Sequence, residues 1–441
     1  MTRIIAAAAF VLLASDTARG QSPAGQAPIA ITLQEAIERG LAASHRLAEA
    51  SARGEIAQAI AAQRHAAALP QVAARAGYTR TNHVEEFGVP LPNNQLRIIY
   101  PDVPNNYQSR LDLQWPIYTG GRLDALERAA QAEAAAAARD LEAARADLRL
   151  EISRAYWALV TATESQRVVE HSVTRMDAHL ADVRNRLAAG LIPPSDVLTV
   201  EAQASRQRML SVQAHSLRDV AEAQLVYLIG AAPGTPVAAA SALELPAPPE
   251  ADGTLFETAQ RQRAERAALD ARVSAAGERA KAARAGRKPT IAIGGGVDYA
   301  RPNPRIFPRQ DAWQQSWDAS INVSWPVFDG GRARAEAAEA AAARRAASER
   351  LAEFDRALDL ELRQRVREAD SSRAAIAAAE DGVRAATEAR RVIGNRFAAG
   401  VATNTDLIDA QVALLQAELD RTQALAAMRL AEARLARALG Q

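Results

Sequence analysis

The stretch Trp115-Pro116-Ile117-Tyr118-Thr119-Gly120-Gly121-Arg122 decides the fold, because it returns as Trp325-Pro326-Val327-Phe328-Asp329-Gly330-Gly331-Arg332. A second segment, NRLAAG at residues 185–190, returns as NRFAAG at residues 395–400. Both pairs have the same offset of 210 residues, so no insertion separates the two copies. A period this long indicates a duplicated domain and not a solenoid of small repeats.

Prolines divide the chain into tracts in which long helices can persist, because a proline inside a helix costs about 3 kcal/mol. The predicted helices occupy residues 33–69, 122–189 and 195–229 in the first half and residues 254–287, 332–399 and 404–439 in the second half. Residues 122–189 contain neither proline nor glycine, and a helix of this length measures on the order of 100 Å. The two shorter helices of each half together match the long one, so we expect them to stack end to end along it.

The far part of the first long helix carries a coiled-coil seam, in which apolar residues are spaced alternately four and three positions apart. The seam consists of Val169, Val173, Met176, Leu180, Val183 and Leu187. We therefore expect this part of the helix to pack against other helices.

The beginning of the chain resembles a secretory signal. Arg3 precedes an apolar run over residues 4–14, and the small residues Ala18 and Gly20 stand before a cleavage point. That run is well short of the about 20 residues that span a bilayer as a helix. We expect a signal peptide at 1–20, a first repeat at 21–230, a linker at 231–253 and a second repeat at 254–441.

Each half also contains two extended segments with apolar and polar residues in alternation. The apolar faces consist of Val72, Ala74, Ala76 and Tyr78; Tyr107, Ser109, Leu111, Leu113, Trp115 and Ile117; Ile291, Ile293, Gly295, Val297 and Tyr299; and Trp317, Ala319, Ile321, Val323, Trp325 and Val327. Strands of about ten residues with this pattern fit a barrel with lipid outside and water inside. They fit equally well a half-buried sheet in a soluble domain, so the strands alone leave both interpretations open.

The aromatic residues favour the membrane interpretation. Twelve of the 19 aromatic residues, including four of the five tryptophans, lie in residues 71–118 and 290–328, and outer-membrane barrels use aromatic residues as interfacial girdles. Four strands per chain leave two open edges, whereas a closed barrel needs at least about eight strands. A membrane barrel therefore needs two or three copies, and strand counting does not choose between them.

The repeated Trp-Pro…Gly-Gly-Arg motif, with the long helix that follows it, resembles the TolC-like outer-membrane efflux protein family. The resemblance extends from about Ile31 to Leu439, and it includes the start of the first helix, where Thr32 is the expected N-cap and Glu35 completes a capping box. It implies a mainly α-helical fold with transmembrane β-structure. Long α-helical hairpins would form a periplasmic α-barrel, joined to a trimeric 12-stranded β-barrel in the outer membrane.

The same resemblance implies the function and the partners. The chain would be a subunit of a passive export duct in a tripartite efflux or secretion pump, and would contact outer-membrane lipid. The homotrimer would dock a periplasmic adaptor (membrane fusion) protein and an inner-membrane pump of the RND, ABC or MFS type. The exported substrate, whether drug, metal ion or protein, is left open by the sequence.

Three groups of site residues follow from the resemblance. Strand–helix hinges are expected at the repeated motif, whose glycines permit an approach angle that side chains would obstruct; they comprise Trp115, Pro116, Gly120, Gly121, Trp325, Pro326, Gly330 and Gly331. Adaptor docking is expected at the helix-to-helix turns, through Gly190, Leu191, Gly400 and Val401. Gly190 and Gly400 also fit ordinary helix C-caps, and Ser195 or Asn404 can begin the next helix.

The third group is a periplasmic gate at the tunnel mouth. Asp406 and Asp409 match paired aspartates of the family, and three residues apart they share a helix face. Six carboxylates of a trimer would crowd around one axis, raise some of their pKa values and attract cations. The alternative is that Asp406 is an early-helix carboxylate favoured by the helix dipole.

The first half contributes Asp196 at the position that corresponds to Asp406. Some relatives lock the mouth with a tyrosine and an arginine, where Phe397 and Ala402 stand here. We therefore include Phe397 in the gate and expect a polar latch that is weaker or differently built.

Several classes of function are not supported. The net charge is +1, which gives no field for binding nucleic acid, and the absence of cysteine excludes disulfides and thiolate metal sites. His171 and His179 could share a helix face, but without a third ligand a solvated face is the better interpretation. Gly294-Gly295-Gly296 lacks the lysine of a phosphate loop, and we assign it to a strand whose curvature small residues ease.

No catalytic pattern occurs in the sequence, so we predict neither an enzyme nor a cofactor nor a metal site. The main alternative to the duct is a soluble periplasmic coiled-coil scaffold or adaptor protein without a pore. It would share the long helical hairpins, but it would not account for the duplicated alternating strands and their tryptophans.

Overall fold

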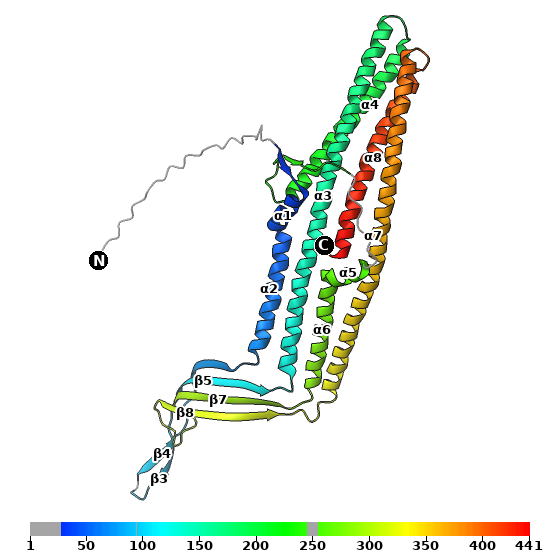
Figure 1. The fold of residues 1–441 in the computed structure, drawn as a ribbon. Helices are drawn as coiled ribbons and strands as arrows, with labels where there is room; N and C mark the ends of the chain where they lie inside the picture. The colour runs from blue at the N-terminus through cyan, green and yellow to red at the C-terminus, as the bar shows by residue number, and fades with distance from the viewer. Residues whose placement is uncertain (1–27, 94, 245–254) are drawn as a thin grey trace, which may run out of the picture.

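The computed structural model describes residues 28–93, 95–244 and 255–441, and it shows a long helical body with a sheet at one end (Figure 1). The predicted signal peptide at 1–20 and the last part of the predicted linker lie outside the described residues. The first half contains β1 (Ile29–Ile31), α1 (Leu33–Ala43), α2 (His45–Ala66), β2 (Gln71–Arg80), β3 (Phe87–Pro90), β4 (Leu96–Tyr100), β5 (Asn105–Tyr118), α3 (Arg122–Ala188), α4 (Pro194–Leu228) and β6 (Val237–Ala239). The second half contains α5 (Leu255–Gln262), α6 (Ala264–Ala285), β7 (Thr290–Arg301), β8 (Gln314–Ser324), α7 (Arg332–Ala398) and α8 (Asn404–Leu439).

The two long helices, α3 and α7, have 67 residues each and run the length of the body, as the absence of proline predicted. The shorter helices pack along them, α2 and α4 against α3 and α6 and α8 against α7. Helices α3 and α6 lie side by side and connect the two halves. Across the described ranges, no helix is long and apolar enough to cross a bilayer.

The first short helix of each half is interrupted, which the sequence analysis did not predict. The continuous helix expected at 33–69 breaks at Ser44, whose hydroxyl accepts a hydrogen bond from Leu47 N–H at 3.3 Å. The helix expected at 254–287 breaks at Arg263. In each half the break lies where the returning helix ends, since Gly230 after α4 packs against Ala43 and Gly440 after α8 packs against Gln262. The breaks therefore make room for the end-to-end junctions that the helix lengths predicted.

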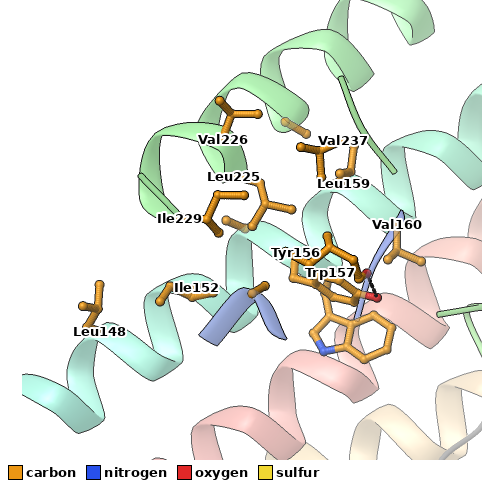
Figure 2. Packing of buried hydrophobic residues seen from close by; sticks show 14 of the residues in the cluster. Leu148, Ile152, Tyr156, Trp157, Leu159, Val160, Leu225, Val226, Ile229 and Val237 are labelled. Atoms are coloured by element: carbon orange, nitrogen blue, oxygen red, sulfur yellow. Dashed lines mark hydrogen bonds between the residues drawn. The ribbon is translucent and has the colours of Figure 1, made fainter. Parts of the chain in front are cut away.

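The first junction is closed by an apolar core around Tyr156 of α3 (Figure 2). The Tyr156 hydroxyl lies 3.2 Å from the carbonyl oxygen of Ile31 and 2.9 Å from Ser241 Oγ. It thus ties the segment after β6 to the parallel pair that β6 forms with β1. The first part of the predicted linker is therefore ordered against α3, and the predicted capping box of Thr32 and Glu35 is confirmed.

Four antiparallel strands form the sheet in the order β2-β5-β7-β8. Its apolar face is open, with Trp317 and Ile321 exposing 74% and 72% of their surface. Strand β8 ends at Ser324, which pairs with the first residue of β7, so the expected continuation to Val327 is wrong. Pro289 precedes β7 and has no N–H with which to extend the ladder. Among the described strands, β2 and β8 each have a partner on one side only.

Each strand-to-helix turn uses two consecutive glycines with positive φ, at 65° and 85° for Gly120 and Gly121 and at 65° and 90° for Gly330 and Gly331. At three of these glycines no atom lies within 4 Å of where a Cβ would stand, so there is space for a side chain. Glycine is favoured at these three positions because of the left-handed backbone alone. Only Gly120 is also short of space, because a Cβ would lie 2.7 Å from Cβ of Lys288. The expectation that side chains would obstruct the turn therefore holds at Gly120 alone.

The lack of space at Gly120, compared with the open space at Gly330, predicts the effects of three alanine variants. A left-handed backbone costs an L-residue about 1–2 kcal/mol, so Gly330→Ala should destabilise the protein by roughly that amount. Gly120→Ala should cost more because it adds the overlap with Lys288. Gly382→Ala, in open space within α7, is the control and should be neutral or stabilising. Thermal unfolding followed by far-ultraviolet circular dichroism measures all three, and equal losses at Gly120 and Gly330 would contradict the packing argument.

Candidate functional site

The turns α3–α4 and α7–α8 lie at the end of the body farthest from the sheet (Figure 1). Both long helices end in the same way: the N–H of Gly190 bonds to the Leu187 carbonyl and the N–H of Leu191 to the Arg186 carbonyl, each at 2.9 Å. Gly400 and Val401 repeat this pair of bonds with Phe397 and Arg396. These are Schellman motifs, in which the positive φ of 73° at Gly190 and 76° at Gly400 favours glycine.

The four residues predicted to dock an adaptor are all exposed at this end. Leu191 and Val401 project apolar side chains that are 73% and 62% exposed. No atom lies within 4 Å of a Cβ built on Gly190 or Gly400. The tip is therefore an apolar protrusion with open space beside each glycine.

Helix α8 begins with a complete capping box. The N–H of Thr403 bonds to Asp406 Oδ2 at 2.8 Å, and the N–H of Asp406 bonds to Thr403 Oγ1 at 3.2 Å. The hydrogen bonds from Thr403 hold the pKa of the Asp406 carboxyl below its usual value. Asp406 is thus an early-helix carboxylate, and α8 begins at Asn404, as predicted, with Thr403 as its N-cap.

The other gate residues occupy different surroundings. Asp409 is exposed one turn further along α8, where it lines a groove between α4 and α8. Asp196 is half-buried in the first turn of α4, a helix that begins at Pro194 after Pro193 and not at Ser195. The structure therefore places Asp406 and Asp409 on one exposed surface of α8, whereas Asp196 is half-buried on α4.

A buried polar contact that the sequence analysis missed joins the two halves next to the gate residues. His179 of α3 is 7% exposed, and its Nε2 lies 2.7 Å from Asn404 Oδ1. The Asn404 amide donates in turn to the Asp196 carbonyl at 3.3 Å. The interpretation of His179 as part of a solvated face is wrong, because α8 covers it, whereas His171 is exposed.

Phe397 packs against the same histidine. The two rings meet edge to face with centroids 5.4 Å apart, and the Arg186 guanidinium lies 4.6 Å from the Phe397 centroid. Burial lowers the pKa of His179, and Arg186 acts in the same direction, whereas Asn404 and Asp182 oppose it. The phenylalanine thus takes part in an apolar and cationic contact between α3 and α7.

The described part of the chain contains no cluster of three or more histidine, aspartate or glutamate side chains arranged to hold a metal ion. The eight predicted hinge residues lie at the two strand-to-helix turns, far from the tip (Figure 1). Trp115 and Pro116 belong to β5, whereas Trp325 and Pro326 follow the end of β8.

Comparison with known proteins assigns the family. The sequence pattern of the outer membrane efflux protein family matches residues 36–231 and 255–441, which is most of the chain. The chain belongs to this family. It is also 29% identical over 306 residues to protein CyaE of Bordetella pertussis, a match that covers 68% of this chain and 61% of CyaE.

Solved structures agree with the fold. A membrane protein from Pseudomonas aeruginosa superimposes with a TM-score of 0.79 at 22% identity, over 92% of each chain. The outer membrane protein VceC of Vibrio cholerae gives 0.77 at 22% identity, over 92% of this chain and 96% of VceC. At this identity the likeness shows a shared fold.

Family membership confirms the resemblance predicted from the repeated Trp-Pro motif. At the level of the family, it also confirms an outer-membrane efflux component. The family consists of channel proteins and not of enzymes, and we assign no catalytic residue.

The burial of His179 predicts an acid-sensitive stability. Because the folded state holds the pKa of His179 below the ordinary histidine value of 6.5, the unfolded chain takes up the proton at a higher pH than the folded chain. Stability should therefore be greatest above about pH 6.5 and fall as the pH decreases from there towards the folded pKa. The measurement is the thermal unfolding midpoint as a function of pH.

The variant His179→Gln should lose this part of the pH dependence, since glutamine donates to Asn404 without titrating in this range. The variant His171→Gln, at an exposed position of the same helix, is the control and should behave like the wild type. Identical profiles for His179→Gln and the wild type would show that the buried imidazole does not contribute.

Proposed function

We propose that the chain forms a homotrimeric, passive export duct across the outer membrane and the periplasm. The observation that carries the proposal is the four-stranded sheet, which has an open apolar face and two outer strands with a single partner each. Lipid cannot satisfy unpaired backbone groups, so edges of this kind need to be joined to other copies. Three chains would close a 12-stranded barrel with β2 of one chain beside β8 of the next.

The alternation of side chains supports a water-filled interior for this barrel. One face carries Val72, Leu111, Trp317 and Ile321, all more than half exposed, and would meet lipid. The opposite face carries Arg110, Asp298 and Asp318. Membrane β-barrels with a channel have the same distribution of polar and apolar residues.

The helices support a continuation of the duct into the periplasm. Helices α2, α3, α6 and α7 lie side by side from the sheet to the middle of the body, and α4, α3, α8 and α7 from there to the tip (Figure 1). Three copies would supply a periplasmic α-barrel of 12 helices at each level. We propose that the duplicated halves, residues 21–230 and 254–441 with the linker 231–253 between them, produce this regularity.

We assign the periplasmic end of the duct to partner binding and closure. The exposed apolar tip at Leu191 and Val401 would dock a periplasmic adaptor, which would link the duct to an inner-membrane pump of the RND, ABC or MFS type. Asp406 and Asp409, with Asp196 and Phe397 behind them, would form the gate. In the trimer, mutual repulsion of the carboxylates would oppose the capping bonds that lower the pKa of Asp406.

Single-channel conductance in planar bilayers tests the duct and the gate together. Wild-type protein should form stable pores that millimolar divalent cations block. The double variant Asp406→Asn, Asp409→Asn should raise the half-blocking concentration at least about tenfold, because the cation-attracting charges are lost. Asparagine is chosen because its side-chain oxygen still accepts the capping bond from Thr403.

The matched control is Asp381→Asn, Glu388→Gln, which removes two exposed carboxylates of α7 that pair with Arg384 and Arg391 of the same helix. It should leave the block unchanged. If divalent cations still block the pores of the double variant at Asp406 and Asp409, the proposed duct stands and the proposed gate is wrong. A folded protein that forms no pores would overturn the duct and support the soluble scaffold.

Capture of a purified periplasmic adaptor from the producing bacterium tests the docking tip. Gly190→Trp and Gly400→Trp should reduce capture at least about tenfold, since a bulky side chain would occupy the contact surface. Gly190→Ala and Gly400→Ala are matched controls, because they carry the same backbone strain without the bulk. Equal capture by the tryptophan and alanine variants would remove the tip from the adaptor interface.

A further inference from the structure

A network of ion pairs crosses the polar face of the sheet and involves three neighbouring strands. Arg110 of β5 bonds through Nε to Asp112 Oδ1 at 2.5 Å, pairs with Asp298 of β7, and donates from Nη2 to Asp318 Oδ1 of β8 at 2.9 Å. Its side chain is 20% exposed and that of Asp298 is 6% exposed. Three carboxylates thus surround one guanidinium in a partly desolvated position.

The glycine at position 296 makes this crossing possible. Asp112, Gly296 and Asp318 lie in register on β5, β7 and β8. A Cβ on Gly296 would lie 2.6 Å from Nη2 of Arg110, so the guanidinium rests directly on the β7 backbone. Gly296 therefore does more than ease curvature, because it provides the space through which Arg110 reaches β8.

The loop between β7 and β8 adds a second arginine from above the sheet. Arg305 Nη1 lies 2.7 Å from Asp318 Oδ1, and Arg305 Nε lies 3.8 Å from Asp298 Oδ2. The fully buried Asn303 holds the loop in this position, since its amide donates to the Gln314 carbonyl at 2.9 Å and to Ser316 Oγ at 3.0 Å. The loop is thus bent towards the polar face and not away from it.

Formal charges in this network cancel. Arg75 of β2 completes it, with Nη1 3.5 Å from Asp112 Oδ2. The three arginines Arg75, Arg110 and Arg305 therefore face the three aspartates Asp112, Asp298 and Asp318. Removal of one member leaves a net charge of one per chain on this face, with a sign that depends on the residue removed.

We infer that this six-residue network determines the charge selectivity of the strand-lined part of the pore by holding its wall near neutrality. The inference rests on the proposed duct, in which the polar face of the sheet lines the pore. Fixed charges on a pore wall enrich permeant ions of opposite sign, and rings of charged side chains set ion selectivity in channels. A balanced wall admits solutes of either sign, so the substrate class of this segment includes both anionic and cationic molecules.

The test is the ratio of cation to anion permeability, obtained from reversal potentials across planar bilayers under a potassium chloride gradient. Arg305→Ala removes one positive charge per chain and should raise the ratio at least about twofold. Asp318→Asn removes one negative charge with little change in shape and should lower the ratio by a similar factor. Opposite shifts from two neighbouring residues cannot arise from a general disturbance of the barrel.

The control is Arg301→Ala, which removes a positive charge from the same hairpin. Arg301 pairs with Asp311 of the loop at 2.8 Å, and in the strand register it stands on the face of Tyr299 and not on that of Asp298. It should leave the permeability ratio unchanged.

Pores with unchanged ratios in Arg305→Ala and Asp318→Asn would overturn the selectivity inference and leave the duct intact. If Arg301→Ala shifted the permeability ratio as much as Arg305→Ala does, the inference would also be overturned, because the effect would then not depend on which face of the sheet carries the charge. A wild-type protein that forms no pores would refute the duct itself. The two failures are therefore distinguishable.

Discussion

The open edges of the sheet constrain the rest of the structure. Backbone N–H and C=O groups need partners, and in a hydrocarbon environment only other strands supply them. Within the described residues, β2 and β8 each receive partners on one side. The need for several copies in the proposed barrel follows from how those two edges are satisfied.

The helices obey a second constraint, which is length. A long helix of 67 residues needs two shorter ones to cover it, and these must meet without a gap. The two junctions solve this problem differently. The first is an apolar core around Tyr156. The second combines a smaller apolar cluster, which includes Leu358 and Leu362, with ion pairs of α8, in which Arg437 bonds to Asp147 at 2.9 Å and pairs with Glu265. The duplicated halves thus share a plan while their contacts have diverged.

Features that depend on local sequence were predictable. The long helices, the four strands of the sheet and the capping box at Thr32 follow from proline spacing, alternation and residue types within a few positions. The break at Ser44 had a local signal, because serine is a preferred N-cap. The break at Arg263 had none, since it has no side-chain cap and depends on the arrival of α8 from the other end of the repeat.

Contacts between distant residues were not predictable in the same way. The partner of His179 is 225 positions away, so a histidine on a helix pattern gave no indication that it is buried. The space above Gly296 is likewise defined by Arg110, which another strand brings into place. Sequence patterns identify which face of an element is polar, but the particular pairs on that face depend on the strand register and the helix packing.

The two helix-to-helix turns show how a duplicated element can acquire an asymmetric role. Both long helices end in the same Schellman motif, but the returning helices begin differently. Pro193 has neither an N–H nor a side-chain oxygen, so Asp196 cannot form the reciprocal bonds that Thr403 forms with Asp406. The carboxylate of the second half is therefore fixed in orientation, whereas that of the first half is not held by a cap. A ring of gate charges needs fixed orientations, and this favours α8 over α4 as the helix that carries it.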